Sequence, residues 1–118
     1  MVTIDLFHNS DDTLDFAAGK TIFSEGDVGD LMYVVTDGEV DLLVKGKLVE
    51  QLAAGGVLGE MALIGKSARS ATAVAKTACK LAPIDEKRFK FLVQQTPNFA
   101  LQLMRIIAER LRRMDERL

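Results

Sequence analysis

The stretch GEMALIGKSARSATAVA, from Gly59 to Ala75, sets two charged side chains among small neighbours. Glu60 and Arg69 stand nine positions apart in it, surrounded by alanine, serine and glycine. The GEMALI portion suits a single helical turn, whose first N–H groups lack helical partners and attract an anion. A glutamate accepts hydrogen bonds from a hydroxyl, and a guanidinium group donates a forked pair to phosphate. The pattern therefore indicates a site for a ligand that carries a hydroxyl and a phosphate.

The composition of the chain is that of one globular domain. It has 118 residues, of which 48% are hydrophobic and 27% charged, with a net charge of −2. This charge gives no overall attraction for nucleic acid. The apolar runs are too short to span a bilayer, and the start MVTIDLF lacks the features of a signal peptide. We expect a soluble, cytoplasmic protein forming a single domain over residues 1–118.

The two parts of the chain differ in pattern. Up to about residue 82, short apolar runs alternate with the turn sequences EGDVGD, TDGE, KGK and AAGG, which favours a compact antiparallel β-roll or barrel. Two strand-like runs flank Lys45-Gly46-Lys47, which predicts a hairpin with Gly46 at its turn. We expect the β-roll over about 11–84.

The remainder of the chain is helical in pattern. Asp85 is a candidate N-cap for a first helix, and Pro97 suits the first turn of a second. We expect these C-terminal helices over about 85–117.

The segment FAAGKTIFSEGDVGDLMYVVTDGEVDLLVKGKLVEQLAAGGVLGEMALIGKSARSATAVA resembles the cyclic nucleotide-binding domain. Catabolite-activator-type regulators, cyclic-nucleotide-dependent kinases and cyclic-nucleotide-gated channels share this domain. The most specific part is LGEMALIGKSARSAT, which is similar to the family's phosphate-binding cassette, roughly FGE-x-AL, a short turn, then PRxAT. The resemblance covers about Asp15 to Leu111. It implies a mainly β fold, a jelly-roll-like antiparallel β-roll (a double-stranded β-helix) with a short cassette helix and two C-terminal helices.

The resemblance also implies roles for individual residues. Glu60 falls on the glutamate that binds the ribose hydroxyl, and Arg69 on the arginine that binds the cyclic phosphate. Leu58 stands where an aromatic residue is usual, and Ala68 where proline is usual. Neither departure removes a ligand group. The expected ligand-binding residues are Leu58, Gly59, Glu60, Met61, Ala62, Arg69, Ser70 and Ala71.

The function that follows is a regulatory sensor that binds a cyclic nucleotide, with cyclic AMP favoured over cyclic GMP. Ser70 beside the arginine is compatible with both ligands. Binding is expected to draw the last helix toward the β-roll, and the base to extend toward that helix. The alternative is a structural or dimerisation domain of the same fold without ligand. Two further alternatives are that Glu60 and Arg69 are solvated charges or pair with each other, and that the domain keeps the fold but has lost ligand binding.

Catalysis is not expected. The sequence offers no nucleophile–base pair, no metal-ligand cluster and no GxxxxGK[ST] phosphate loop, so we predict no catalytic residue, metal or cofactor. The family's members join this domain to an effector, and we expect no DNA-binding domain within this chain. An effector domain or partner protein is therefore expected.

The last helix carries two apolar strips. Phe99, Leu103 and Ile106 form one, which is expected to pack on the β-roll. The other follows heptad spacing and predicts a weak homodimer; it consists of Ala100, Met104, Ile107, Leu111, Met114 and Leu118. Four charged residues are candidates to touch the base, namely Arg105, Glu109, Arg110 and Arg113. Otherwise the RLRRMDERL cluster is expected to be a solvated face.

The other notable residues have structural interpretations. The glycines at positions 26, 29, 38, 46 and 55 are expected to form turns without a ligand role. Cys79 is expected in the core and His8 at the surface.

Overall fold

The computed structural model describes residues 12–117, with side chains through residue 113. His8 and Leu118 thus lie outside the described part, as does the side chain of Met114. Within residues 12–117, eight strands form two four-stranded antiparallel sheets. In order, the first sheet is β1 (Leu14–Phe16), β8 (Cys79–Ile84), β3 (Met32–Asp37) and β6 (Val57–Leu58). The second is β2 (Thr21–Phe23), β7 (Thr72–Ala75), β4 (Val40–Val44) and β5 (Lys47–Leu52).

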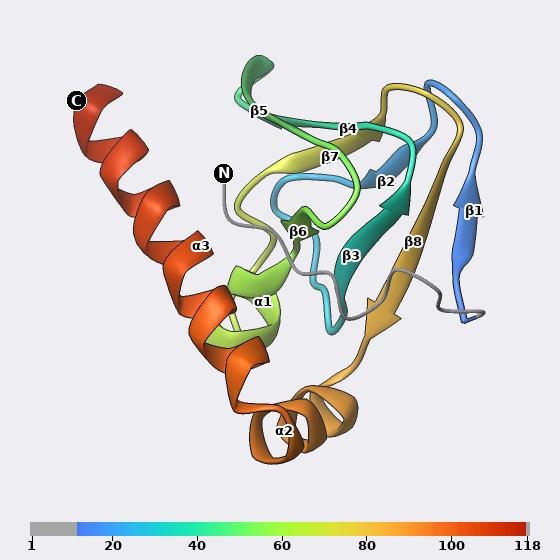
Figure 1. Ribbon diagram of the computed structural model, residues 1–118. Coiled ribbons are helices and arrows are strands. Elements are labelled where there is room, and N and C mark those ends of the chain that lie inside the picture. The colour runs from blue at the N-terminus through green and yellow to red at the C-terminus, as the bar shows by residue number, and fades with distance from the viewer. Residues whose placement is uncertain (1–11, 118) are drawn as a thin grey trace.

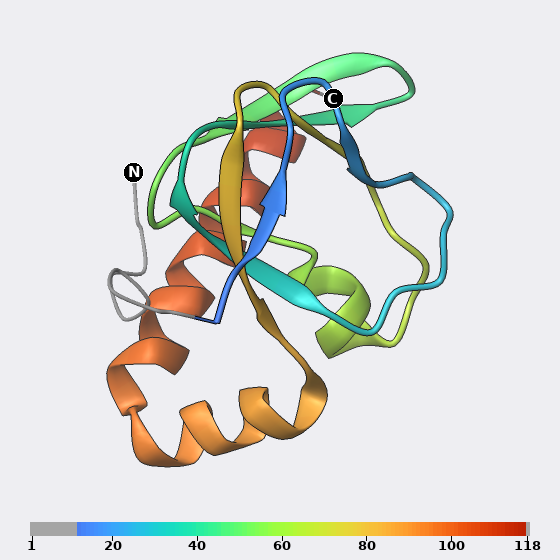
Figure 2. The same cartoon turned by 90° about the vertical axis from the view of Figure 1, so that its right-hand side faces the viewer.

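Three helices complete the structure. The short α1 (Glu60–Gly65) follows β6, whereas α2 (Glu86–Gln95) and α3 (Pro97–Arg117) follow the last strand. In Figure 1, α3 runs along one side of the β-roll past α1, and α2 lies at its base. The view in Figure 2 likewise places α3 behind the strands. The predicted β-roll with a cassette helix and two C-terminal helices is confirmed, and the sheets do not close into a barrel.

The predicted hairpin joins β4 to β5. Its two turn residues, Lys45 and Gly46, have φ values of 52° and 77°. Positive φ at both positions is the type I′ geometry, whose twist matches that of the flanking strands. Lys47 already belongs to β5, so the turn is one residue shorter than the KGK sequence.

The helices begin where the sequence predicts. Asp85 caps α2, since its Oδ1 accepts a hydrogen bond from the Arg88 backbone N–H at 2.8 Å. Pro97 is the first residue of α3. The strip Phe99, Leu103 and Ile106 is buried against β3, β8, α1 and α2, as expected. This packing fixes α3 against the roll.

The remaining core lies between the two sheets. Cys79 is 4% exposed within it, which confirms its expected place. Burial, followed by the nearby charges of Asp15 and Asp37, raises the pKa of its thiol. Of the helices among the described residues, none is both long and apolar enough to cross a bilayer.

Candidate ligand-binding site

A cavity of about 420 Å³ lies between the second sheet, α1 and α3. This volume is in the range of small-molecule sites. Apolar side chains from both sheet and helix form one part of its wall, and five charged side chains form another. The apolar part consists of Phe23, Leu42, Val44, Val49, Ile107 and Leu111. The charged part consists of Glu50, Glu60, Arg69, Arg110 and Arg113.

Arg69 is a buried cation without a carboxylate partner among the described residues. It lies on the loop after α1 and lines the cavity, and the residue is only 6% exposed. Nη1 donates a hydrogen bond to the Gly59 carbonyl oxygen at 3.2 Å, and Cζ lies 4.2 Å from the centroid of the Phe23 ring. Within residues 12–117, Nε finds no hydrogen-bond acceptor. A buried guanidinium group with an unused donor is suited to an anion in the cavity.

Glu60 begins α1 at the same cavity. It is 3% exposed, and its carboxylate forms an ion pair with Arg110 of α3. Gly59 precedes it with a φ of 81°, a conformation that favours glycine and lets the chain turn from β6 into the helix. The carboxylate is therefore held at the cavity by a residue fifty positions further along the chain.

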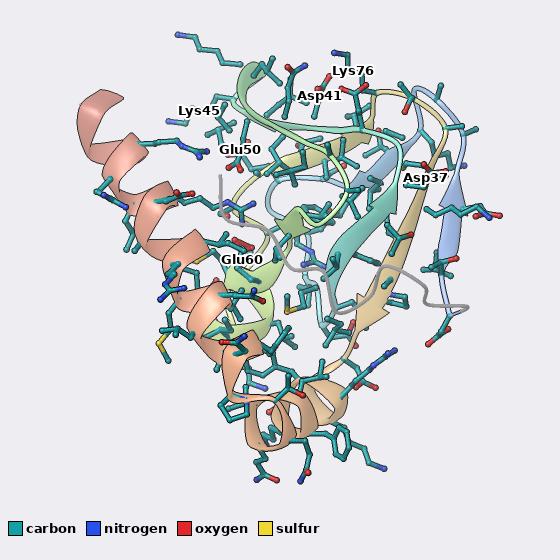
Figure 3. The ribbon with its side chains drawn as sticks, viewed as in Figure 1. Asp37, Asp41, Lys45, Glu50, Glu60 and Lys76 are labelled. Carbon is teal, nitrogen blue, oxygen red and sulfur yellow. The ribbon has the colours of Figure 1, made fainter. Side chains whose placement is uncertain are left out.

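Arg110 bridges two elements of the roll. Besides Glu60, its guanidinium group contacts Glu50 of β5, with Nε 3.0 Å from Oε1, and donates to the Val57 carbonyl oxygen. Burial disfavours the charged form, but the charges of Glu60 and Glu50 and their hydrogen bonds outweigh it, so the pKa of Arg110 is raised. Arg113 Nη1 lies 3.3 Å from the same Glu50 oxygen. Figure 3 shows Glu50 and Glu60 on the side of the roll that faces α3.

The charges that line the cavity do not balance. Three arginines and two glutamates leave an excess of one positive charge. Both carboxylates pair with α3, since Arg110 contacts each of them. The excess is therefore located at Arg69, and an anion would neutralise it.

Seven of the eight sequence-predicted residues line this cavity. They are Gly59, Glu60, Met61, Ala62, Arg69, Ser70 and Ala71. The exception is Leu58, which is 0% exposed and packs in the core with β3 and β8 neighbours instead. Its side chain points away because a two-residue strand places alternate residues on opposite faces.

The structure also excludes one alternative and corrects one expectation about charge. Glu60 and Arg69 are neither solvated nor paired with each other. The basic cluster of α3 is not wholly a solvated face either, because Arg110 reaches the buried Glu60. Of the four α3 candidates for the base, Arg110 and Arg113 line the cavity, whereas Arg105 and Glu109 do not.

The sequence did not reveal Glu50 and Phe23 as lining residues. Leu42 of β4 pairs with Glu50 of β5, and the next residue of β4 pairs with Leu48. Val49 of β5 is therefore an extra residue opposite β4. A bulge of this kind lets two consecutive residues face one side, and both Val49 and Glu50 line the cavity. Strict alternation would have placed only one of them there, and no turn residue in LVEQL marks the bulge.

A second cavity, of about 470 Å³, lies on the other side of α1. It is bordered by the Val28–Asp30 turn, the loop after α1 and the start of α2. Its lysine at position 66 pairs with Glu86, and both side chains are about half exposed. Since its lining includes no buried charge in need of a partner, the cavity at Arg69 is the better candidate site.

Comparison with known proteins supports one family. The protein-family model described as "Cyclic nucleotide-binding domain" matches residues 13–96 of this chain. A cAMP-dependent protein kinase regulatory subunit of Schizosaccharomyces pombe is 38% identical over 94 residues, which are 79% of this chain and 22% of that protein. The chain thus spans less than a quarter of this relative's length.

Solved structures show the same architecture. The catabolite activator protein of Thermus thermophilus is 32% identical, with a TM-score of 0.81 over 89% of this chain and 52% of that one. The EAL enzyme Bd1971 is similar in two ligand states. Its cAMP-bound form is 34% identical (TM-score 0.65, 87% of this chain, 29% of that one), and its cGMP-bound form 31% (TM-score 0.68, 88% and 29%). With its cassette, its cavity and a family match over most of its length, the chain belongs to the cyclic nucleotide-binding domain family.

Proposed function

We propose that this domain binds cyclic AMP, in preference to cyclic GMP, and regulates an effector through α3. The sensing of a cyclic nucleotide is the function of the family. Ser70 beside Arg69 is compatible with both ligands, and the preference for cyclic AMP rests on this position not being threonine, the residue that the family's cyclic GMP-dependent kinases have there. Of its relatives, the S. pombe protein is a cAMP-dependent regulatory subunit, and Bd1971 has been captured with either nucleotide.

The observation that carries the proposal is the unpaired charge of Arg69. A cyclic phosphodiester has a single negative charge, which would neutralise the excess positive charge of the cavity. The guanidinium group of Arg69, which lines the cavity, would donate to the phosphate, and Gly59 to Ala62 would offer backbone N–H groups at the start of α1. Leu58 is withdrawn from this proposed set, because its side chain is in the core.

The remaining groups of the ligand find matching chemistry. Glu60 would accept a hydrogen bond from the 2′-hydroxyl while keeping its ion pair with Arg110, since a carboxylate has several acceptor positions. The base would lie against the apolar wall from β4, β5 and α3. Arg113 and Glu50 border this part of the cavity and offer a donor and an acceptor for its edge.

The same contacts would couple the ligand to α3. Two side chains of this helix, Arg110 and Arg113, are bound to acids of the roll at the cavity. A ligand that adds contacts to α3 only in its docked position favours that position by the difference in binding free energy. The domain itself would perform no reaction.

The partners are proposed more generally. We place the domain, over residues 1–118, in the cytoplasm with an effector domain or partner protein. A second candidate function is ligand-independent dimerisation through α3, favoured by Met104 and Leu111, which are 64% and 52% exposed. A weak homodimer through this seam is compatible with either function.

Thermal unfolding with and without nucleotides tests the proposal. A ligand at 100 times its dissociation constant stabilises the folded state by about 2.7 kcal/mol. We expect cyclic AMP, and more weakly cyclic GMP, to raise the unfolding temperature, and 5′-AMP, whose phosphate carries more charge and no ring, to have little effect. If none of the cyclic nucleotides changes the unfolding temperature, ligand-independent dimerisation is the better account.

A further inference from the structure

Gly29 is a glycine whose backbone does not require glycine. Six of the nine glycines have a positive φ, Gly26 among them with 90°, but Gly29 does not. Other residues can therefore adopt its conformation, and a turn-forming role does not explain its identity.

The space around Gly29 gives a different reason for the missing side chain. A Cβ atom built on Gly29 would lie 2.5 Å from Nη2 of Arg69 and closer still to its Nε and Cζ atoms. Real Cβ atoms essentially never approach another heavy atom within 3.0 Å. The guanidinium group thus occupies the place that any side chain at position 29 would need.

Neither backbone segment is free to move apart. The Gly26 N–H donates to the Arg69 carbonyl oxygen, and the Arg69 N–H donates to that of Asp27, both at 2.8 Å. These bonds tie the turn before Gly29 to the loop that carries Arg69. The clash would therefore be relieved by rotation of the Arg69 side chain, which costs less than breaking both backbone bonds.

The guanidinium group has two further neighbours, Phe23 and Gly59. The Phe23 ring lies on one side of it, and at Gly59 an added Cβ would be 2.6 Å from Nη1. Position 59, however, also favours glycine because its φ is 81°. A substitution there would strain the backbone as well as crowd Arg69, so the two effects cannot be separated. At Gly29 a side chain would crowd Arg69 without straining the backbone.

We propose that Gly29 is a positioning residue for Arg69, because the missing Cβ keeps open the only space in which the guanidinium group can face the cavity. The inference rests on the proposed function only in taking that group as the phosphate ligand. It differs from the expectation that Gly29 is a turn-former without a ligand role. Arg69 would leave the cavity wall in any variant with a side chain at position 29.

A pair of alanine substitutions in the same turn separates positioning from folding. For Gly29→Ala we expect an unchanged or slightly raised unfolding temperature, because alanine fits this backbone and restricts the unfolded chain. Its dissociation constant for cyclic AMP and cyclic GMP should rise at least about tenfold, as for the loss of a hydrogen-bonded charge. Gly26→Ala, which strains a positive φ but meets no atom within 4 Å, should lower the unfolding temperature and keep the affinity within about twofold. Wild-type affinity in Gly29→Ala would overturn the inference.

A combined variant covers the case in which Gly29→Ala destabilises the fold. If crowding at Arg69 is the cause, adding Arg69→Ala restores the unfolding temperature of the Arg69→Ala single variant. If stability is not restored, the added methyl group clashes elsewhere and the inference is wrong.

A resonance of Arg69 tests the inference without any nucleotide. The Nε–H group is buried beside the Phe23 ring, so its ¹H–¹⁵N signal should be shifted from those of exposed arginines. Arg69→Lys identifies the signal by removing it. We expect Gly29→Ala to move it to the exposed position and Gly26→Ala to leave it in place. Should the wild type bind neither nucleotide, the proposed function fails while this signal still decides the role of Gly29, and an unmoved signal in Gly29→Ala contradicts it.

Discussion

Arg110 of α3 forms an ion pair with Glu60, the first residue of α1, and so joins the last helix to the cassette. The two side chains are 16% and 4% exposed. Glu60 is therefore paired with a cation even when no ligand is bound, whereas Arg69 is paired with no anion among the described residues. This asymmetry is why the site is suited to a ligand with one negative charge and a hydroxyl.

The buried pair should contribute strongly to stability. Removing one partner of a buried ion pair leaves an uncompensated charge and typically costs about 3–5 kcal/mol. Arg110→Met leaves Glu60 without its cation and should lower the free energy of unfolding by about that amount. Glu60→Gln should cost less, since Arg110 keeps Glu50. Urea denaturation provides the values.

Arg112→Met is the matched control for this comparison. Arg112 is on the same helix and is exposed, so its substitution should change the free energy of unfolding by less than about 0.5 kcal/mol. If Arg110→Met proved no more destabilising than this control, the pair would not hold α3 to the roll.

The assignment of Glu60 to the ribose can be tested with a modified ligand. Glu60→Ala should weaken the binding of cyclic AMP but have much less effect on 2′-deoxy cyclic AMP, which lacks the hydroxyl. The comparison is a double-mutant cycle between protein and ligand, which also cancels the effect of freeing Arg110. Titration calorimetry measures both affinities. Equal losses for the two nucleotides would place the hydroxyl elsewhere.

Alkaline pH should destabilise the domain through Cys79. Its raised pKa means that the folded protein keeps the thiol proton where the unfolded chain loses it. The free energy of unfolding should therefore fall as pH rises above about 8.5, the ordinary value for a thiol. Burial also raises the pKa of Tyr33, which adds to the fall at higher pH.

Denaturation of the wild type and Cys79→Ala at several pH values measures the contribution of the thiol to this pH dependence. In Cys79→Ala, the part of the decrease between about pH 8.5 and 10 that comes from the thiol should vanish. An identical pH profile in this variant and the wild type would show that the thiol does not titrate differently on folding.

The exposed seam of α3 predicts a weak homodimer. Met104→Asp should lower the average mass seen by sedimentation at high protein concentration and leave ligand affinity unchanged, because Met104 does not line the cavity. Phe91→Asp on α2, at a residue 60% exposed, is the control and should not affect the mass. A wild type that remains monomeric at every concentration would exclude the dimer.

Local chemistry explains why much of the fold was predictable. The hairpin turn at Gly46, the Asp85 cap and Pro97 each depend on neighbouring residues alone, and the structure has all three where the sequence predicted them. The strip of Phe99, Leu103 and Ile106 was predictable because helical periodicity decides which face is buried.

What escaped prediction depends on contacts between distant segments. Glu50 faces the cavity because of a bulge in β5, and the sequence of this strand contains no residue that predicts a bulge. The partner of Glu60 is fifty residues away, and the sequence suggested Arg110 only as one of four candidates to touch the base. The space needed at Gly29 likewise appears only when Arg69 is placed next to it.

Titration calorimetry of cyclic AMP and cyclic GMP against wild type, Arg69→Gln and Arg112→Gln tests the central claim most directly. The account predicts that the wild type binds, that Arg112→Gln binds equally well, and that Arg69→Gln binds at least about tenfold more weakly with its fold intact. If Arg69→Gln binds either nucleotide as tightly as the wild type, the buried, unpaired guanidinium group is not the phosphate ligand and the account is contradicted.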